Sequence, residues 1–138
     1  MFVKKESVKT IWAVAIFAIA MGFLEAAVVV YLRQLFYPSG FSFPLIGFVK
    51  PFILNVEWLR EFATLVMLVA VGWLSGKKFS EKCAYFLFAF AVWDIAYYAF
   101  LKLVLGWPAS LFTWDLLFLI PWPWAGPVIT PVLYALLM

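Results

Sequence analysis

The feature that most constrains this chain is its first apolar run, Ile11 to Leu32, which holds about 22 residues and one charged side chain, Glu25. A helix of about 20 apolar residues spans the hydrocarbon core of a bilayer. The composition agrees, because 68% of the residues are hydrophobic, 12% are charged and the mean hydropathy is +1.08. Such values lie outside the range of soluble domains. We therefore expect an integral membrane protein solvated by lipid.

The first predicted helix also shares features with a secretory signal peptide. Three lysines precede the apolar run, and the segment Ala18 to Ala20 offers a small-x-small cleavage pattern. The run is long enough to span a bilayer, however, so we predict an uncleaved helix over about 8–35. It ends before Tyr37-Pro38-Ser39-Gly40, a turn cluster that a helix does not continue through.

Two more spanning helices are predicted in the middle of the chain. The first covers about 53–75 and ends at Gly76-Lys77-Lys78. The second covers about 80–105, starts with Ser80 as its N-cap and ends at Gly106-Trp107-Pro108. The connection over 40–52 is rich in Phe and Pro, so we expect it at the level of the lipid headgroups.

The last part of the chain is too interrupted for one regular helix. An apolar run over 110–120 is followed by the proline-rich segment 121–127 and by a second apolar run over 128–138. Together they predict either a broken fourth helix of about 33 Å or a re-entrant hairpin. The expected fold is an all-α, polytopic transmembrane helical bundle in one domain, 1–138. Because the sequence ends on apolar residues without a basic flank, a truncated C-terminus is an alternative interpretation.

Basic residues predict the orientation of the bundle. By the positive-inside rule, the side of the membrane with more Lys and Arg is cytoplasmic. The N-terminus and the turn between the second and third helices hold six of the ten basic residues. They are Lys4, Lys5, Lys9, Lys77, Lys78 and Lys82, against Arg33, Lys50, Arg60 and Lys102 on the opposite side. We therefore predict a cytoplasmic N-terminus.

A shift of the sequence by 69 positions indicates an internal repeat. The segment Glu25 to Arg33 then lies over Asp94 to Lys102, and both read acid-x-Ala-x-x-x-aromatic-Leu-base. A duplicated helical hairpin would explain the match and would bring the two acids to the same depth. The alternative is coincidence, since apolar matches are frequent in so biased a composition.

Nearly all acidic residues outside the termini fall in the outer half of the predicted membrane. A carboxylate in hydrocarbon costs at least about 2.5 kcal/mol, so such residues usually pair, line water or serve a pathway. Gly22, between Ala18 and Ala26, permits close approach of another helix beside Glu25. The candidate polar-site residues are Glu25, Arg33, Glu57, Arg60, Glu61, Asp94, Tyr97, Tyr98, Lys102 and Asp115.

Two interpretations of this charged layer are open. In the first, interhelical ion pairs, such as Glu25 or Asp94 with Arg60, fix the order of the helices. In the second, unpaired carboxylates in an outward-open cavity hold a proton, a cation or a polar group of a substrate. Glu25 and Asp94 are the strongest site candidates because they lie deep within their predicted spans.

Composition also excludes several kinds of site. The chain has no histidine, which removes the commonest zinc ligand and the usual haem ligand, and its single cysteine, Cys83, cannot form an internal disulfide. No phosphate-binding loop, catalytic triad or spaced metal motif is present, so we expect no cofactor and no metal site. The basic residues form no patch, which argues against nucleic acid.

Three functional hypotheses follow. The first is a transporter-like protein for a proton, a cation or a small polar solute. The second is a non-catalytic structural or assembly subunit of a larger membrane complex. The third is a membrane enzyme acting on a lipid-like substrate, and only the acidic residues support it. The expected partners are membrane lipids, together with further copies of the chain or other subunits.

Two runs of the sequence, Gly22 to Arg33 and Trp114 to Pro121, resemble those of small, uncharacterised prokaryotic membrane proteins. From the apolar runs and the distribution of basic residues we expect a multi-pass protein of the prokaryotic plasma (inner) membrane, whereas the resemblance itself implies no fold. It implies no activity, substrate or site residue.

Overall fold

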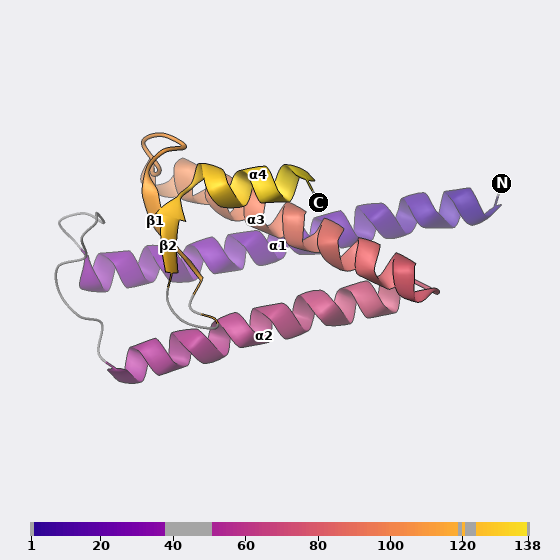
Figure 1. Cartoon of the computed structure of the whole chain (residues 1–138), viewed down its shortest axis with the longest axis horizontal. Helices are drawn as coiled ribbons and strands as arrows, with labels where there is room; N and C mark the ends of the chain where they lie inside the picture. The colour runs from indigo at the N-terminus through magenta and orange to yellow at the C-terminus, as the bar shows by residue number, and fades with distance from the viewer. Residues whose placement is uncertain (1, 38–50, 119, 121–123, 138) are drawn as a thin grey trace.

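A computed structural model describes residues 2–37, 51–118, 120 and 124–137 of the chain. Its described part is mostly helical, with four helices and one two-stranded sheet (Figure 1). The elements are α1 (Phe2–Phe36), α2 (Pro51–Ser75), α3 (Phe79–Leu105), β1 (Trp114–Phe118), β2 (Trp124–Pro127) and α4 (Ile129–Leu137). The three long helices confirm the predicted ones, with α1 beginning earlier than expected.

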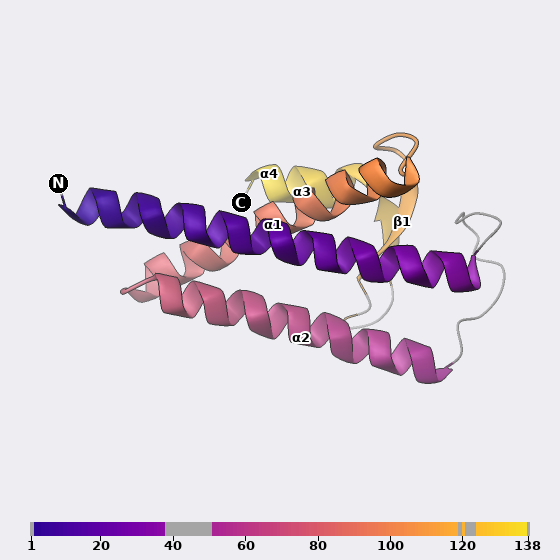
Figure 2. The ribbon, with the colours of Figure 1, turned by 180° about the vertical axis from the view of Figure 1, so that it is seen from behind.

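Helix α3 is the centre of the molecule, and it packs against α1, α2 and α4 (Figures 1 and 2). Successive helices alternate in direction, so α1 and α3 run the same way. Helices α1 and α2 make few direct contacts. The buried apolar side chains form two clusters, one around Leu68 and Trp93 and the other around Leu101 and Val128.

The contact between α1 and α3 depends on small residues. Ala18 and Ala26 are buried, and Gly22 lies between them on the same face. A Cβ added at Gly22 would come within 2.8 Å of the Ala96 Cβ and 3.0 Å of the Trp93 carbonyl oxygen. Since atoms cannot approach so closely, only glycine allows the two backbones this distance. The small-residue row beside Glu25 is therefore the surface that packs on α3.

Local contacts and backbone conformation determine where α3 begins and ends. At its start, the Glu81 carboxylate accepts hydrogen bonds from the backbone N–H groups of Lys77 (2.9 Å) and Lys78 (3.3 Å). The helix begins at Phe79, so the expected cap at Ser80 is replaced by this carboxylate. At its end, Gly106 adopts the left-handed conformation, with φ of 68°, which a residue with a side chain rarely adopts.

The expected helix over 110–120 is wrong. Trp114–Phe118 instead forms strand β1, which pairs antiparallel with β2, with Asp115 opposite Gly126 and Leu116 opposite Ala125. Prolines at 121, 123 and 127 lack the N–H that a continuing helix needs, so a regular helix over this part of the sequence is disfavoured. Helix α4, at nine residues, lies within the predicted 128–138 and is far too short to span.

The repeat is visible only in part. Helices α1 and α3 run in parallel, but a strand pair follows α3 directly, and α4 has nine residues where α2 has 25. The duplicated hairpin is therefore not reproduced beyond its first helix. The predicted headgroup connection lies outside the described residues, except for Pro51 and Phe52, which begin α2.

Two of the described helices are long and apolar enough to cross a membrane. They are the part of α1 from Lys5 to Phe36 and the whole of α3, whose most apolar 18-residue stretches have mean hydropathies of 2.4 and 1.6. The third expected span, α2, carries Glu57, Arg60 and Glu61 in its first half. The uncharged segment 62–75 that follows them is shorter than the roughly 20 residues of a full span.

Candidate functional site

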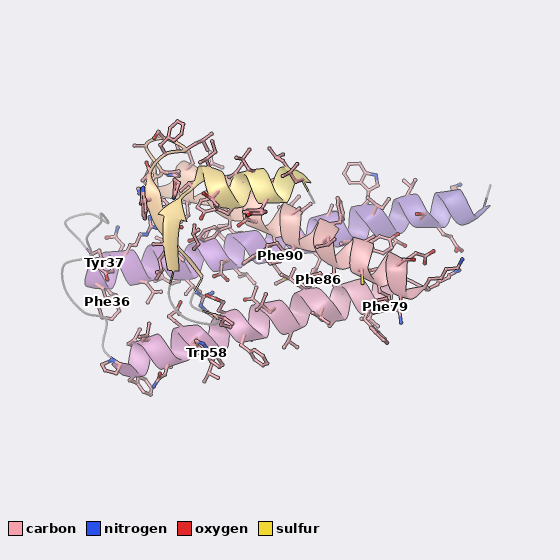
Figure 3. The ribbon with its side chains drawn as sticks, in the orientation of Figure 1. Phe36, Tyr37, Trp58, Phe79, Phe86 and Phe90 are labelled. Atoms are coloured by element: carbon pink, nitrogen blue, oxygen red, sulfur yellow. The ribbon has the colours of Figure 1, made fainter. Side chains whose placement is uncertain are left out.

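A partly open cavity of about 160 Å³ lies where α1 ends and α2 begins. Figure 3 shows Phe36 and Tyr37 at this end of α1. Helices α1, α2 and α3, strand β1 and the start of α4 all contribute to its wall. A buried water needs about 10–15 Å³ by the same measure, so the space suits several waters or a small solute. Nine of the ten candidate residues line it: Glu25, Arg33, Glu57, Arg60, Glu61, Asp94, Tyr97, Tyr98 and Asp115.

Asp115 is the most completely bonded acid of the cavity. One of its oxygens lies 3.4 Å from Nη2 of Arg33 and accepts a hydrogen bond from the Leu116 backbone N–H at 2.8 Å. The other accepts from the Tyr98 hydroxyl at 2.9 Å. Arg33 also lies over the ring of Trp107, with its guanidinium carbon 3.8 Å from the ring centre. These contacts join α1, α3 and β1, so the group acts as a buried structural tie.

Arg60 forms a second tie, between α1 and α2. Its Nη1 lies 2.6 Å from a carboxylate oxygen of Glu25. Its Nε and Nη2 donate to the carboxylate of Glu57, one turn earlier on the same helix, with 3.0 Å for the Nε bond. Because α1 and α2 otherwise hardly touch, this ion pair is a main connection between them. The expected pairing of Arg60 with Glu25 is present; Asp94 is not its partner.

Glu61 connects α2 to the strand pair. Its Oε1 accepts a hydrogen bond from the backbone N–H of Ile120 at 3.1 Å. This contact joins positions 59 residues apart in the sequence. In Figure 1, the strands reach across from the side of α3 and α4 towards α2, which fits this bond. The strand pair therefore closes one side of the cavity.

Asp94 differs from the other four acids. Its side chain is buried, with 6% of the residue exposed, and its Oδ2 has no hydrogen-bond partner among the described residues. A buried polar atom without a partner is uncommon, because it loses its bonds to water and gains none in return. Neither Arg33 nor Arg60 neutralises it. Asp94 therefore offers the cavity a hydrogen-bond acceptor, its Oδ2, that no described residue uses.

Two other candidates take different places. Tyr97 lines the cavity and packs its ring edge-on against Tyr98, with the ring centres 4.8 Å apart. Lys102 lies outside the cavity, where its Nζ donates to the carbonyl oxygens of Gly106 (3.3 Å) and Pro108 (2.8 Å). It completes the end of α3, so the two bases of the repeated motif have unlike surroundings: Arg33 is buried and Lys102 is exposed.

The sequence did not identify several residues of the wall. Trp93 lines the cavity next to Asp94, and just outside the wall the Trp107 ring stacks on Arg33. Leu116 and Leu117 reach it because β1 is a strand. A Trp directly before an intramembrane acid was the one available signal, but belts of aromatic residues at the membrane interface are a commoner cause.

The cavity carries an excess of negative charge. Its wall holds five carboxylates against two guanidinium groups, which leaves a formal excess of three negative charges when all are ionised. Over the described ranges, no group of three or more Asp, Glu, Cys or His side chains is arranged to hold a metal ion.

Comparison of the chain with protein-family models, curated proteins and solved structures gives no match. The function must therefore be argued from the site.

Proposed function

We propose that this chain is an integral membrane protein that binds a small cation in its cavity and acts in a transporter-like manner. The observation that carries the proposal is Asp94, a buried carboxylate on the cavity wall whose Oδ2 is unpaired within the described structure. Charged residues inside membranes usually mark ion or substrate pathways unless they are paired.

The apolar exterior supports placement in a membrane. Large apolar side chains are exposed along α1 and α2, among them Trp12 at 66% and Leu74 at 84%. Soluble proteins rarely expose apolar patches of this extent, whereas lipid solvates them. With six of the ten basic residues on the cytoplasmic side, α1 enters from the cytoplasm and the cavity lies in the outer half of the plasma membrane.

The partners of the other charges support a cation over an anion. Arg33 is engaged by Asp115, and Arg60 is engaged by two glutamates. An anion would have to displace these carboxylates to reach a guanidinium group. A cation needs only to approach Asp94, and the negative excess of the wall attracts it.

A structural or assembly subunit is the second candidate. The outer face of α2 favours it, because Trp58 and Phe62 are both exposed and their rings stack at 6.1 Å on a surface that α3 leaves uncovered. Such a surface suits a second copy or another subunit as well as lipid. The two arginine ties also serve assembly, but Asp94 takes no part in them.

The test is cation flux into proteoliposomes loaded with dyes for protons, Na⁺ and K⁺. We expect wild-type flux of at least one cation, and a decrease of about tenfold or more in Asp94→Asn. Glu6→Gln is the matched control, since Glu6 is an exposed acid outside the cavity, and it should keep the wild-type rate. Equal rates in wild type and Asp94→Asn, or no flux of any cation, would contradict the proposal and favour the second candidate.

A further inference from the structure

The geometry points to a small organic ammonium ion as the cation of this cavity. In this assignment, an N–H of the ion donates to Asp94 while its carbon end lies among aromatic and aliphatic side chains. The inference rests on the cation site proposed above and names its class of ligand. Three features of the cavity support it: the free acceptor, the engagement of the other carboxylates and the apolar wall.

The free acceptor fits an N–H donor. Asp94 is 6% exposed, and its Oδ2 has no hydrogen-bond partner among the described residues. An ammonium N–H donated to a carboxylate makes a charge-assisted hydrogen bond, which is shorter and stronger than a neutral one. One such bond satisfies the orphaned oxygen and neutralises the charge at the same time.

The other carboxylates of the cavity each have a partner within the protein. Asp115 has Arg33 and Tyr98 as partners, Glu25 has Arg60, and Glu61 has the Ile120 N–H. Hard metal ions such as Mg²⁺ and Ca²⁺ need six or more oxygen ligands around one point. No such cluster exists among the residues described. An ammonium ion needs fewer acceptors, so a single unpaired carboxylate suits it better.

The rest of the cavity wall suits the hydrocarbon part of such an ion. Trp93, Tyr97 and Phe36 offer aromatic rings, and Val29 and Leu54 offer aliphatic surface. Aromatic faces attract cations, most strongly where water is excluded. The protein already uses this contact beside the cavity, where the Arg33 guanidinium carbon lies 3.8 Å from the centre of the Trp107 ring. A cavity of about 160 Å³ holds a solute with a few carbon atoms.

The test is binding to the full chain in lipid nanodiscs, with radiolabelled ethylammonium, Na⁺ and Rb⁺ as probes. We expect saturable ethylammonium binding that Na⁺ and K⁺ displace only at concentrations about tenfold higher or more. Asp94→Asn should lose binding at least about tenfold, and Glu6→Gln should not. Circular dichroism melts of each variant establish that both are folded.

A second pair of variants tests the aromatic wall. Tyr97→Leu should weaken ethylammonium binding about three- to tenfold, in the range of a desolvated cation–π contact. Tyr31→Leu is the matched control, because Tyr31 is 66% exposed on α1 and lies outside the cavity.

The outcomes separate this inference from the proposed function. If Na⁺ or Rb⁺ binds in an Asp94-dependent manner and ethylammonium does not, the cation site stands and the ligand class assigned here is wrong. If no probe shows binding that depends on Asp94, the cation site itself is contradicted, and the ligand class with it.

Discussion

At the scale of single residues, the cavity holds two kinds of buried acid. Asp115 is 3% exposed and bonded to Arg33, Tyr98 and the backbone N–H of Leu116, while Asp94 is 6% exposed and has an oxygen without a partner among the described residues. Removing one partner of a fully bonded buried charge is strongly destabilising, whereas an unpaired buried charge itself costs free energy that a bound ligand can recover. The two acids should therefore respond to mutation in opposite ways.

We predict that Asp115→Ala lowers the free energy of unfolding by about 3 kcal/mol, because it leaves the buried Arg33 without its carboxylate. Asp94→Asn should cause no loss of stability, or a small gain, because it removes an unpaired charge. Unfolding by SDS in mixed micelles, followed by circular dichroism, measures both. Equal destabilisation by the two variants would show that Asp94 also has a structural partner.

A reversal at Arg60 tests the second tie. Glu25→Lys should weaken the contact between α1 and α2 by placing two cations together, and Glu25→Lys with Arg60→Glu should recover part of the loss. We expect a destabilisation of about 2 kcal/mol or more for the single variant. A double variant no more stable than the single one would mean that the pair contributes nothing specific.

At the scale of elements, the closeness of α1 and α3 sets the shape of the cavity. Gly22 packs against the backbone of Trp93 and Tyr97 on α3, and Asp94 lies between these two residues in the sequence. The position of Asp94 relative to α1 therefore depends on a glycine one turn from Glu25.

Gly22→Val is predicted to separate α1 from α3, because its first added carbon would lie 2.8 Å from the Ala96 Cβ. We expect a loss of at least about 2 kcal/mol, as for an overpacked core position. Ala20→Val places a similar change on the exposed face of the same helix and should cost little. Thermal melts in detergent compare them, and a stable Gly22→Val protein would contradict the observed packing.

The elements also show how far the sequence could predict the fold. The three long helices were predictable because their apolar runs are long and end at Gly, Pro or Lys clusters such as Gly106. The strand pair was not, since eleven apolar residues suit a strand or a helix equally by pattern. Its choice depends on contacts distant in sequence, such as Ile120 with Glu61, which no local pattern contains.

At the scale of the whole molecule, the candidate site, like the fold, could be predicted only in part from the sequence. The fixed rise of a helix allowed the sequence to place the acids at one depth, and five of them line one cavity. Which acid stays unpaired was not predictable. That depends on the approach of Arg33 to Asp115, 82 positions away, through a strand that the sequence had not indicated.

The orientation of the molecule gives the last prediction, and the chain offers its own probe. Cys83 is the single cysteine, is exposed and lies in the first turns of α3 beside Lys82, at the end opposite the cavity. A membrane-impermeant maleimide should label it in inverted vesicles and not in spheroplasts. Gln34→Cys in a Cys83→Ser background, exposed near the cavity end of α1, should give the reverse pattern. Labelling of both positions from one side would contradict the proposed topology, and labelling of Cys83 from outside would invert it, because the cavity would then open towards the cytoplasm.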